Sequence, residues 1–279
     1  MAKGLALTIG LNAVDPRHYA GWSGRLQACE ADAHDMADIA RARKFTVQPL
    51  LSRRATRRAV LAGIARAAAA LRPGDIFLLT YSGHGGQVPD RSHDEPDLQD
   101  ETWCLYDGEL IDDEINRALA HFRAGVRVLV LSDSCHSGTV TKAMFYAARG
   151  AAGAGPRAAG AERIRYRNMP REVALRTYRA HRAMYDKLQD AIKGDPRAAV
   201  RAAVILISGC QDNQLSQDGD FNGLFTASLL RVWKEGRFKG SYRTLHSAIV
   251  NSMPPDQTPK LFTIGASVRA FERQQPFTV

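Results

Sequence analysis

Nearly continuous apolar runs at residues 75–80, 126–131 and 203–209 are the feature of this chain that most constrains its fold. A strand that is buried on both faces is apolar along its length, whereas a half-exposed strand alternates apolar and polar residues. Helical patterns separate these runs along the chain. The sequence therefore predicts an α/β fold in which a parallel sheet carries helices on both faces.

The rest of the pattern extends this alternation. We expect further strands at residues 5–11, 45–51 and 258–265, a short strand or hairpin arm at 103–106, and helices at about 29–43, 56–71, 112–122, 170–192, 223–233 and 242–251. Residues 87–101 are predicted to form a polar, acidic loop. With 279 residues and 45% apolar content, the chain can bury the core of one large domain, so we expect a single domain over 1–279.

A histidine and a cysteine follow two of the predicted strands. His84 lies in the segment 81–86 (Tyr-Ser-Gly-His-Gly-Gly), and Cys135 lies in the segment 132–138 (Ser-Asp-Ser-Cys-His-Ser-Gly). Chemistry in an open parallel sheet gathers beyond the carboxyl ends of its strands. Either residue alone is more often structural, but the pair predicts a cysteine nucleophile whose proton the histidine takes. The adjacent His136 is expected to point to another side.

The segments 81–87 (Tyr-Ser-Gly-His-Gly-Gly-Gln) and 133–139 (Asp-Ser-Cys-His-Ser-Gly-Thr) resemble those of the caspase-like cysteine peptidases, in particular metacaspases and bacterial orthocaspases. Cys135 stands 51 positions after His84, which is close to the ~50 residues noted for caspases. Segments 223–226 and 257–259 resemble the family as well. The resemblance implies a caspase-like three-layer α/β/α sandwich around a mostly parallel sheet of about six strands.

The same resemblance implies the roles of the catalytic residues. Cys135 would be the nucleophile and His84 the acid and base, which together form a dyad. The backbone N–H groups of Gly85 and Cys135 would form the oxyanion hole.

The resemblance also implies a pocket for the substrate residue on the amino side of the cut bond (the P1 residue, bound in the S1 pocket). The residues that match the metacaspase S1 pocket are Cys29, Asp32, Ser82 and Asp133. Two carboxylates in a narrow pocket suit a guanidinium or ammonium group. We therefore expect protein or peptide substrates with Arg or Lys at P1. The alternative for Asp32 is a solvated position on its helix.

Calcium is a possible activator on the same grounds, although the Cys–His chemistry needs no cofactor. The acidic segments 94–101 and 111–114 resemble positions at which calcium-dependent metacaspases place carboxylates, and oxygen ligands suit Ca²⁺. The candidate ligands are Asp100, Asp112 and Asp113. Lys142 stands where a further acidic ligand is expected, and Asp112 and Asp113 could instead cap the following helix.

The net charge of +9 belongs to one segment, because residues 140–202 hold fourteen Lys and Arg against five Asp and Glu. Within this basic insert, residues 147–157 are rich in Gly and Ala, which predicts a mobile loop. We expect a zymogen that is activated when the chain itself, or an upstream protease, cuts the insert at about 142–171. The candidate positions are Arg149, Arg157, Arg163, Arg165 and Arg167. A solvated insert that only aids solubility is the alternative.

Other classes of protein find little support in the sequence. The cysteines at 29, 104, 135 and 210 have neither zinc spacing nor a disulfide pattern, and no apolar run is as long as a membrane span or a signal peptide requires. We expect a cytoplasmic monomer with no membrane or nucleic-acid partner. Two alternatives stay open: a catalytically silent caspase-like scaffold, and a nucleic-acid-binding protein that uses the insert.

Overall fold

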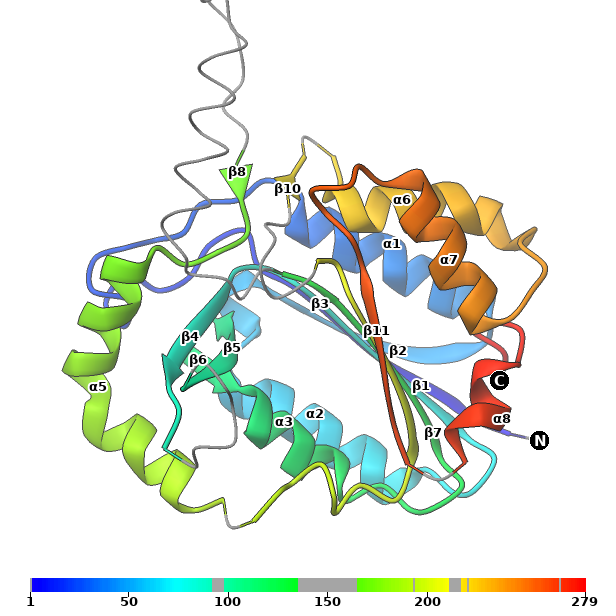
Figure 1. Cartoon of the computed structure of the whole chain (residues 1–279), viewed down its shortest axis with the longest axis horizontal. Coiled ribbons are helices and arrows are strands. Elements are labelled where there is room, and N and C mark those ends of the chain that lie inside the picture. Colours follow the sequence, from blue (N-terminus) through cyan, green and yellow to red (C-terminus); the bar gives the residue numbers. More distant parts are fainter. Residues whose placement is uncertain are drawn as a thin grey trace, which may run out of the picture.

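A six-stranded sheet forms the centre of the computed structural model, which describes residues 2–91, 98–134, 165–192, 194–210, 217–219, 221–265 and 267–279. Its strand order is β11-β9-β7-β3-β1-β2 (Figure 1). The strands are β1 (Gly4–Gly10), β2 (Phe45–Leu51), β3 (Ile76–Ser82), β7 (Arg127–Asp133), β9 (Ala203–Ser208) and β11 (Lys260–Ile264). Only β11 pairs antiparallel to its neighbour in this sheet. The expected mostly parallel sheet is confirmed.

Helices cover both faces of the sheet (Figure 1). One layer holds α2 (Arg57–Ala70) and α3 (Asp112–Leu119), and the other holds α1 (Cys29–Ala42), α6 (Leu224–Trp233), α7 (Tyr242–Ser252) and α8 (Val268–Glu272). Short 3₁₀ turns lie at η1 (Ser52–Arg54) and η2 (Lys234–Gly236). Along β3, Phe77 and Leu79 face the first layer and Ile76 and Leu78 the second, so every residue of this strand is buried. This double burial explains the continuous apolar runs.

A second, antiparallel sheet follows His84. It consists of β4 (Gly85–Pro89), β5 (Gln99–Leu105) and β6 (Gly108–Ile111), and α5 (Arg171–Asp190) packs against β4 (Figure 1). The prediction of a loop over 87–101 is wrong at both ends, because β4 runs to Pro89 and β5 begins at Gln99. Residues 92–97 lie outside the described part of the chain. The sequence predicted a loop here because these strands carry polar side chains. An antiparallel sheet can hold polar residues because one of its faces can be exposed to solvent.

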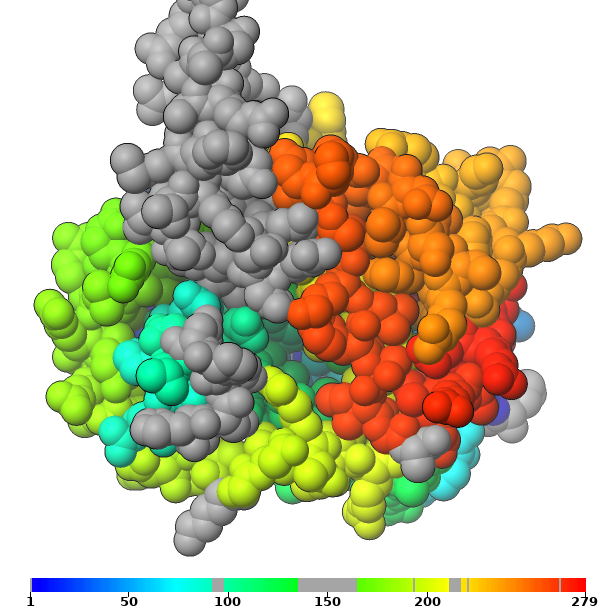
Figure 2. All heavy atoms as spheres, in the orientation of Figure 1, coloured from blue at the N-terminus to red at the C-terminus, as the bar shows by residue number. Residues whose placement is uncertain are grey.

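The chain after α5 runs along the lower edge of the molecule toward β9 (Figure 2). At the carboxyl edge of the central sheet, β8 (Arg165–Tyr166) pairs antiparallel with β10 (Gln217–Asp218). The predicted mobile loop at 147–157 lies outside the described residues. Within the described ranges, no helix has the length and apolar character that crossing a bilayer requires.

The carboxyl ends of the central strands meet in one row. The register pairs Gly10 with Ser82 and Ser82 with Asp133. A side chain at Gly10 could not be accommodated, because its Cβ would lie 2.2 Å from the carbonyl oxygen of Cys29 in α1. Glycine at this position therefore lets the first turn of α1, with Asp32, approach the strand ends.

Candidate active site

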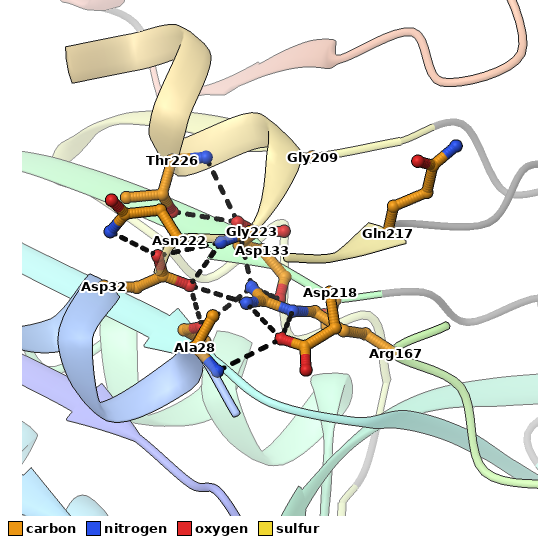
Figure 3. Close-up of polar contacts among 12 residues, drawn as sticks. Ala28, Asp32, Asp133, Arg167, Gly209, Gln217, Asp218, Asn222, Gly223 and Thr226 are labelled. Carbon is orange, nitrogen blue, oxygen red and sulfur yellow. Dashed lines mark hydrogen bonds and ion pairs between the residues drawn. The ribbon is translucent and has the colours of Figure 1, made fainter. Parts of the chain in front are cut away.

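Three of the four expected S1 residues, Asp32, Ser82 and Asp133, converge on the side chain of Arg167. Figure 3 shows Asp32 and Asp133 beside its guanidinium. The guanidinium of Arg167 is 0% exposed, with Nη2 lying 2.7 Å from Asp32 Oδ2 and Nη1 lying 2.9 Å from Asp133 Oδ2. Ser82 Oγ donates a hydrogen bond to Asp32 Oδ2 (2.7 Å). Asp32 is 1% exposed, which rules out a solvated position. Cys29, the fourth residue, is fully buried, and burial raises the pKa of its thiol, so it stays protonated.

A third carboxylate that the sequence did not single out completes this pocket. Asp218, on β10, forms an ion pair with Arg167 at 3.0 Å. Burial raises the pKa of the Asp32 carboxyl, and Arg167 opposes that rise. Burial alone would lower the pKa of Arg167, but the carboxylates of Asp133, Asp32 and Asp218 raise it well above its usual value. The pocket is therefore built to hold a cation, because three buried carboxylates without one would be strongly destabilising.

The start of α6 holds two of the carboxylates in place. The amide of Asn222 and the backbone N–H of Gly223 donate to Asp32 Oδ1 at 2.9 and 3.1 Å. Thr226 donates to Asp133 Oδ2 through its hydroxyl at 2.8 Å and its backbone N–H at 3.2 Å. The amino end of a helix favours such anions. Gly223 also leaves room for the ligand, since a Cβ there would lie 2.5 Å from Arg167 Cζ.

His84 directly follows β3 and is 5% exposed. Its carbonyl accepts a hydrogen bond from the hydroxyl of Tyr81 (2.7 Å), and its Nε2 lies 3.0 Å from the carbonyl oxygen of Gly24. A carbonyl can only accept, so in the neutral ring Nε2 carries the proton and Nδ1 has the free lone pair. Nδ1 makes no hydrogen bond of normal geometry among the described residues, although the backbone of Asn168 lies near enough to favour the protonated ring. The carbonyl of Gly24 thus orients His84, and no side-chain pattern in the sequence marks this partner.

The imidazole of His84 is neutral near pH 7. Burial lowers its pKa to about 4, and the positive charge of Arg167 adds to this effect, while the Gly24 carbonyl opposes it. Protonation is unfavourable because the buried ring would carry its charge out of contact with water. His84 can therefore act as a base at Nδ1.

The main chain around Arg167 is held in place as firmly as its side chain. The backbone N–H of Gly85 donates to the carbonyl oxygen of Arg167 at 3.0 Å. On the carboxyl side, Met169 donates its N–H to the Gly85 carbonyl at 2.8 Å. On the amino side, Tyr166 pairs with Gln217 in the ladder between β8 and β10. Residues 165–169 therefore cross the strand ends as an extended segment beside His84.

Some of the residues expected to act in catalysis or processing lie outside the described part of the chain. Cys135, Arg149, Arg157 and Arg163 are among them. In the sequence, Cys135 stands two residues after Asp133, the last residue of β7. Of the two described processing candidates, Arg165 is exposed on β8 and Arg167 is buried in the carboxylate pocket.

The candidate calcium ligands lie on the small sheet and the helix after it. Asp100 is on β5, while Asp112 and Asp113 begin α3. Among the described residues, no three His, Cys, Asp or Glu side chains converge as a metal site. Asp112 Oδ2 is already paired with Arg197 Nη2 at 3.0 Å.

Comparisons with known proteins agree with this fold. Residues 3–275 match the family model of the caspase domain. Metacaspase-1 of Schizosaccharomyces pombe is 29% identical over 270 residues, which cover 84% of this chain and 59% of that protein. Metacaspase-1A of Aspergillus fumigatus is 30% identical over 264 residues, which cover 81% and 59%. The chain thus spans less than three fifths of the length of these curated relatives.

A solved structure matches the chain from end to end. The crystal structure of protein GSU0716 from Geobacter sulfurreducens has a TM-score of 0.89 to this chain and 61% sequence identity, over 99% of both chains. The described fold is therefore one that this family of chains adopts.

Proposed function

We propose that this chain, which belongs to the caspase-domain family, is a cysteine endopeptidase that cleaves after Arg or Lys and is made as a zymogen. Membership in the family and the similarity to metacaspases support a cysteine peptidase. One observation carries the finer proposal. The chain presents its own Arg167 to the site as a P1 residue, with the side chain among carboxylates and the carbonyl on the Gly85 N–H.

The proposed chemistry uses the geometry around that carbonyl. His84 Nδ1 takes the thiol proton of Cys135, and the sulfur attacks the carbonyl carbon of Arg167. The Gly85 N–H stabilises the developing oxyanion, together with the N–H of Cys135. The C–N bond to Asn168 then breaks, the histidine returns the proton to the leaving amine, and a thioester remains on Cys135. Water hydrolyses this thioester and releases the carboxylate of Arg167.

The same contact would keep the uncut chain inactive toward other substrates. While Arg167 fills the carboxylate pocket, no other P1 side chain can enter it. Cleavage after Arg167, by the chain itself or by an upstream protease, is the proposed activating step. Of the five processing candidates, Arg167 is the one whose described contacts resemble those of a bound substrate.

Intact mass measurement over time tests this proposal. The wild type is compared with Cys135→Ala, with Arg167→Gln, and with a chain in which Arg149, Arg157, Arg163 and Arg165 are all changed to Gln. We expect a single cut between Arg167 and Asn168 in the wild type and in the fourfold variant, and none in the other two. Cleavage of Arg167→Gln at the wild-type rate would overturn Arg167 as the activating position. Cleavage of Cys135→Ala would overturn the nucleophile.

A second candidate function rests on the complete burial of Arg167. An inhibited caspase-like scaffold would keep that residue in the pocket permanently. An arginine-peptide electrophile distinguishes the two, because only a working site labels Cys135. Labelling of the wild type but not of His84→Ala supports the peptidase, and no labelling after limited trypsin cleavage supports the scaffold.

Calcium is kept as a proposed activator at Asp100, Asp112 and Asp113. The pairing of Asp112 with Arg197 speaks against a ready-made site. Hydrolysis of a basic peptide with millimolar calcium and with a chelator, in the wild type and in Asp112→Asn, tests the proposal. Equal wild-type rates under both conditions would overturn it.

A further inference from the structure

We propose that Asp218 makes this pocket specific for a guanidinium group, so that arginine is the P1 residue and lysine is a poor substitute. The inference rests on the proposed function and narrows its substrate class. Asp32 and Asp133 explain a preference for a cation in general. Asp218 adds a contact that only an arginine side chain can make (Figure 3).

All three nitrogen atoms of the Arg167 guanidinium have acceptors. Nη1 donates to Ser82 Oγ (2.8 Å) and to the carbonyl oxygen of Asp133 (3.3 Å). Nη2 donates to Asp32 Oδ2 (2.7 Å) and to Asp218 Oδ1 (3.0 Å). Nε donates to Asp218 Oδ1 at 3.3 Å. The carboxylate of Asp218 therefore accepts from the two nitrogens along one edge of the guanidinium plane.

A lysine side chain lacks the atoms that this edge requires. Its fourth side-chain carbon stands where arginine has Nε, and its single ammonium carries three donors in place of five. An ammonium near Asp32 and Asp133 would leave the buried carboxylate of Asp218 without its donor at Nε. A buried carboxylate that loses its cationic partner is costly even while the backbone N–H of Gln27 still donates to it, so the pocket discriminates against lysine by the ion pair that is lost.

Contacts outside the Arg167 side chain also hold the Asp218 carboxylate in place. Its Oδ2 accepts from the backbone N–H of Gln27 at 2.8 Å, and its Oδ1 lies 3.4 Å from the backbone nitrogen of Ala28. Its own main chain pairs with Arg165 in the β8–β10 ladder. The residue thus contacts the P1 side chain and the main chain two residues before it. Its side chain is 2% exposed, which strengthens each of these contacts.

A double-mutant cycle on self-cleavage tests the inference. The four chains are the wild type, Arg167→Lys, Asp218→Asn and the double variant, and the rate of fragment formation is measured for each. We expect Arg167→Lys to slow cleavage by about 10-fold or more in the wild-type background, because a hydrogen bond to a charged group is lost. In the Asp218→Asn background the same change should cost less than about 3-fold. An equal factor in both backgrounds would overturn the inference.

A stability cycle keeps the test independent of catalysis. The same four chains are made with Cys135→Ala, and their melting temperatures are compared. We expect Arg167→Lys to lower the melting temperature, and to lower it by less in the chain that also carries Asp218→Asn. If Asp218→Asn does not fold, Asp218→Glu replaces it, since the added methylene moves the carboxylate away from Nε. If the two substitutions are coupled in melting temperature but no chain cleaves itself, the pocket is supported and the peptidase proposal is overturned. If the chains cleave themselves but the two substitutions are not coupled, only the inference about arginine is overturned.

Discussion

The carbonyl oxygen of Arg167 accepts a hydrogen bond from the backbone N–H of Gly85 at 3.0 Å. The side chain of the same arginine is enclosed by three carboxylates. Side chain and main chain of one residue are therefore held at the same time, which fixes the position of the peptide bond that follows. Proximity of this kind is the largest advantage that an intramolecular substrate has over a free one.

Gly223→Ala should exclude arginine from the pocket. The backbone of Gly223 (φ −61°, ψ 152°) suits alanine, but the new Cβ would lie 2.5 Å from the guanidinium. We expect loss of self-cleavage and a free energy of unfolding lower by about 1–3 kcal/mol, the usual cost of overpacking. Denaturant unfolding measures this cost. In an Arg167→Ala background the same substitution should cost little, and an equal cost in both backgrounds would contradict the steric argument.

His84→Ala should lower the rate of cleavage by about two to four orders of magnitude, as expected for loss of an acid–base group. Cys135→Ala should abolish cleavage, because no nucleophile remains. Fragment formation and hydrolysis of a basic peptide are the measurements. His136→Ala is the matched control and should keep the wild-type rate. A large loss in His136→Ala with a normal rate in His84→Ala would exchange the roles of the two histidines.

Acid should destabilise the chain through His84. Its pKa is about 4 in the folded protein and near 6.5 in the unfolded chain, so the unfolded state binds more protons between these values. The free energy of unfolding should therefore fall as the pH drops from 6.5 to 4, by about 3 kcal/mol from this residue. The comparison is Cys135→Ala with and without His84→Gln, because the other titrating groups are common to both. If the free energy of unfolding of the two variants changes equally with pH, His84 does not contribute to the acid destabilisation.

After cleavage the two fragments should stay together. The fragment that ends at Arg167 supplies β7, and the fragment that begins at Asn168 supplies β9, which pairs with β7 in the central sheet. Met169, just past the cut, is 2% exposed in the core, so it anchors the new amino end. Size-exclusion chromatography of cut protein should give one peak with the retention of the intact chain. Two peaks without denaturant would refute this expectation.

The central sheet was predictable because its strands are buried on both faces, which produces continuous apolar runs in the sequence. The meeting of Ser82 with Asp133 then follows from strand register alone. Asp218 was not predictable, because it lies on β10, a strand of two residues that is too short to show a pattern of apolar and polar positions. The carbonyl of Gly24 carries no side-chain identity, so no residue pattern marks it as the partner of His84. β4 was not predicted because its short segment is rich in glycine and polar residues, a composition that is also typical of a loop.

Arg167 is covalently joined to the pocket that it fills, which makes the inhibition of the uncut chain insensitive to dilution. A tethered group acts at an effective concentration that reaches the millimolar range for short flexible connections. A free arginine peptide would have to exceed that concentration to enter the pocket of an uncut molecule. Diluting the protein does not change the competition between Arg167 and a free peptide for the pocket. Cleavage of the bond after Arg167 ends the tethering of that residue permanently in the molecule concerned.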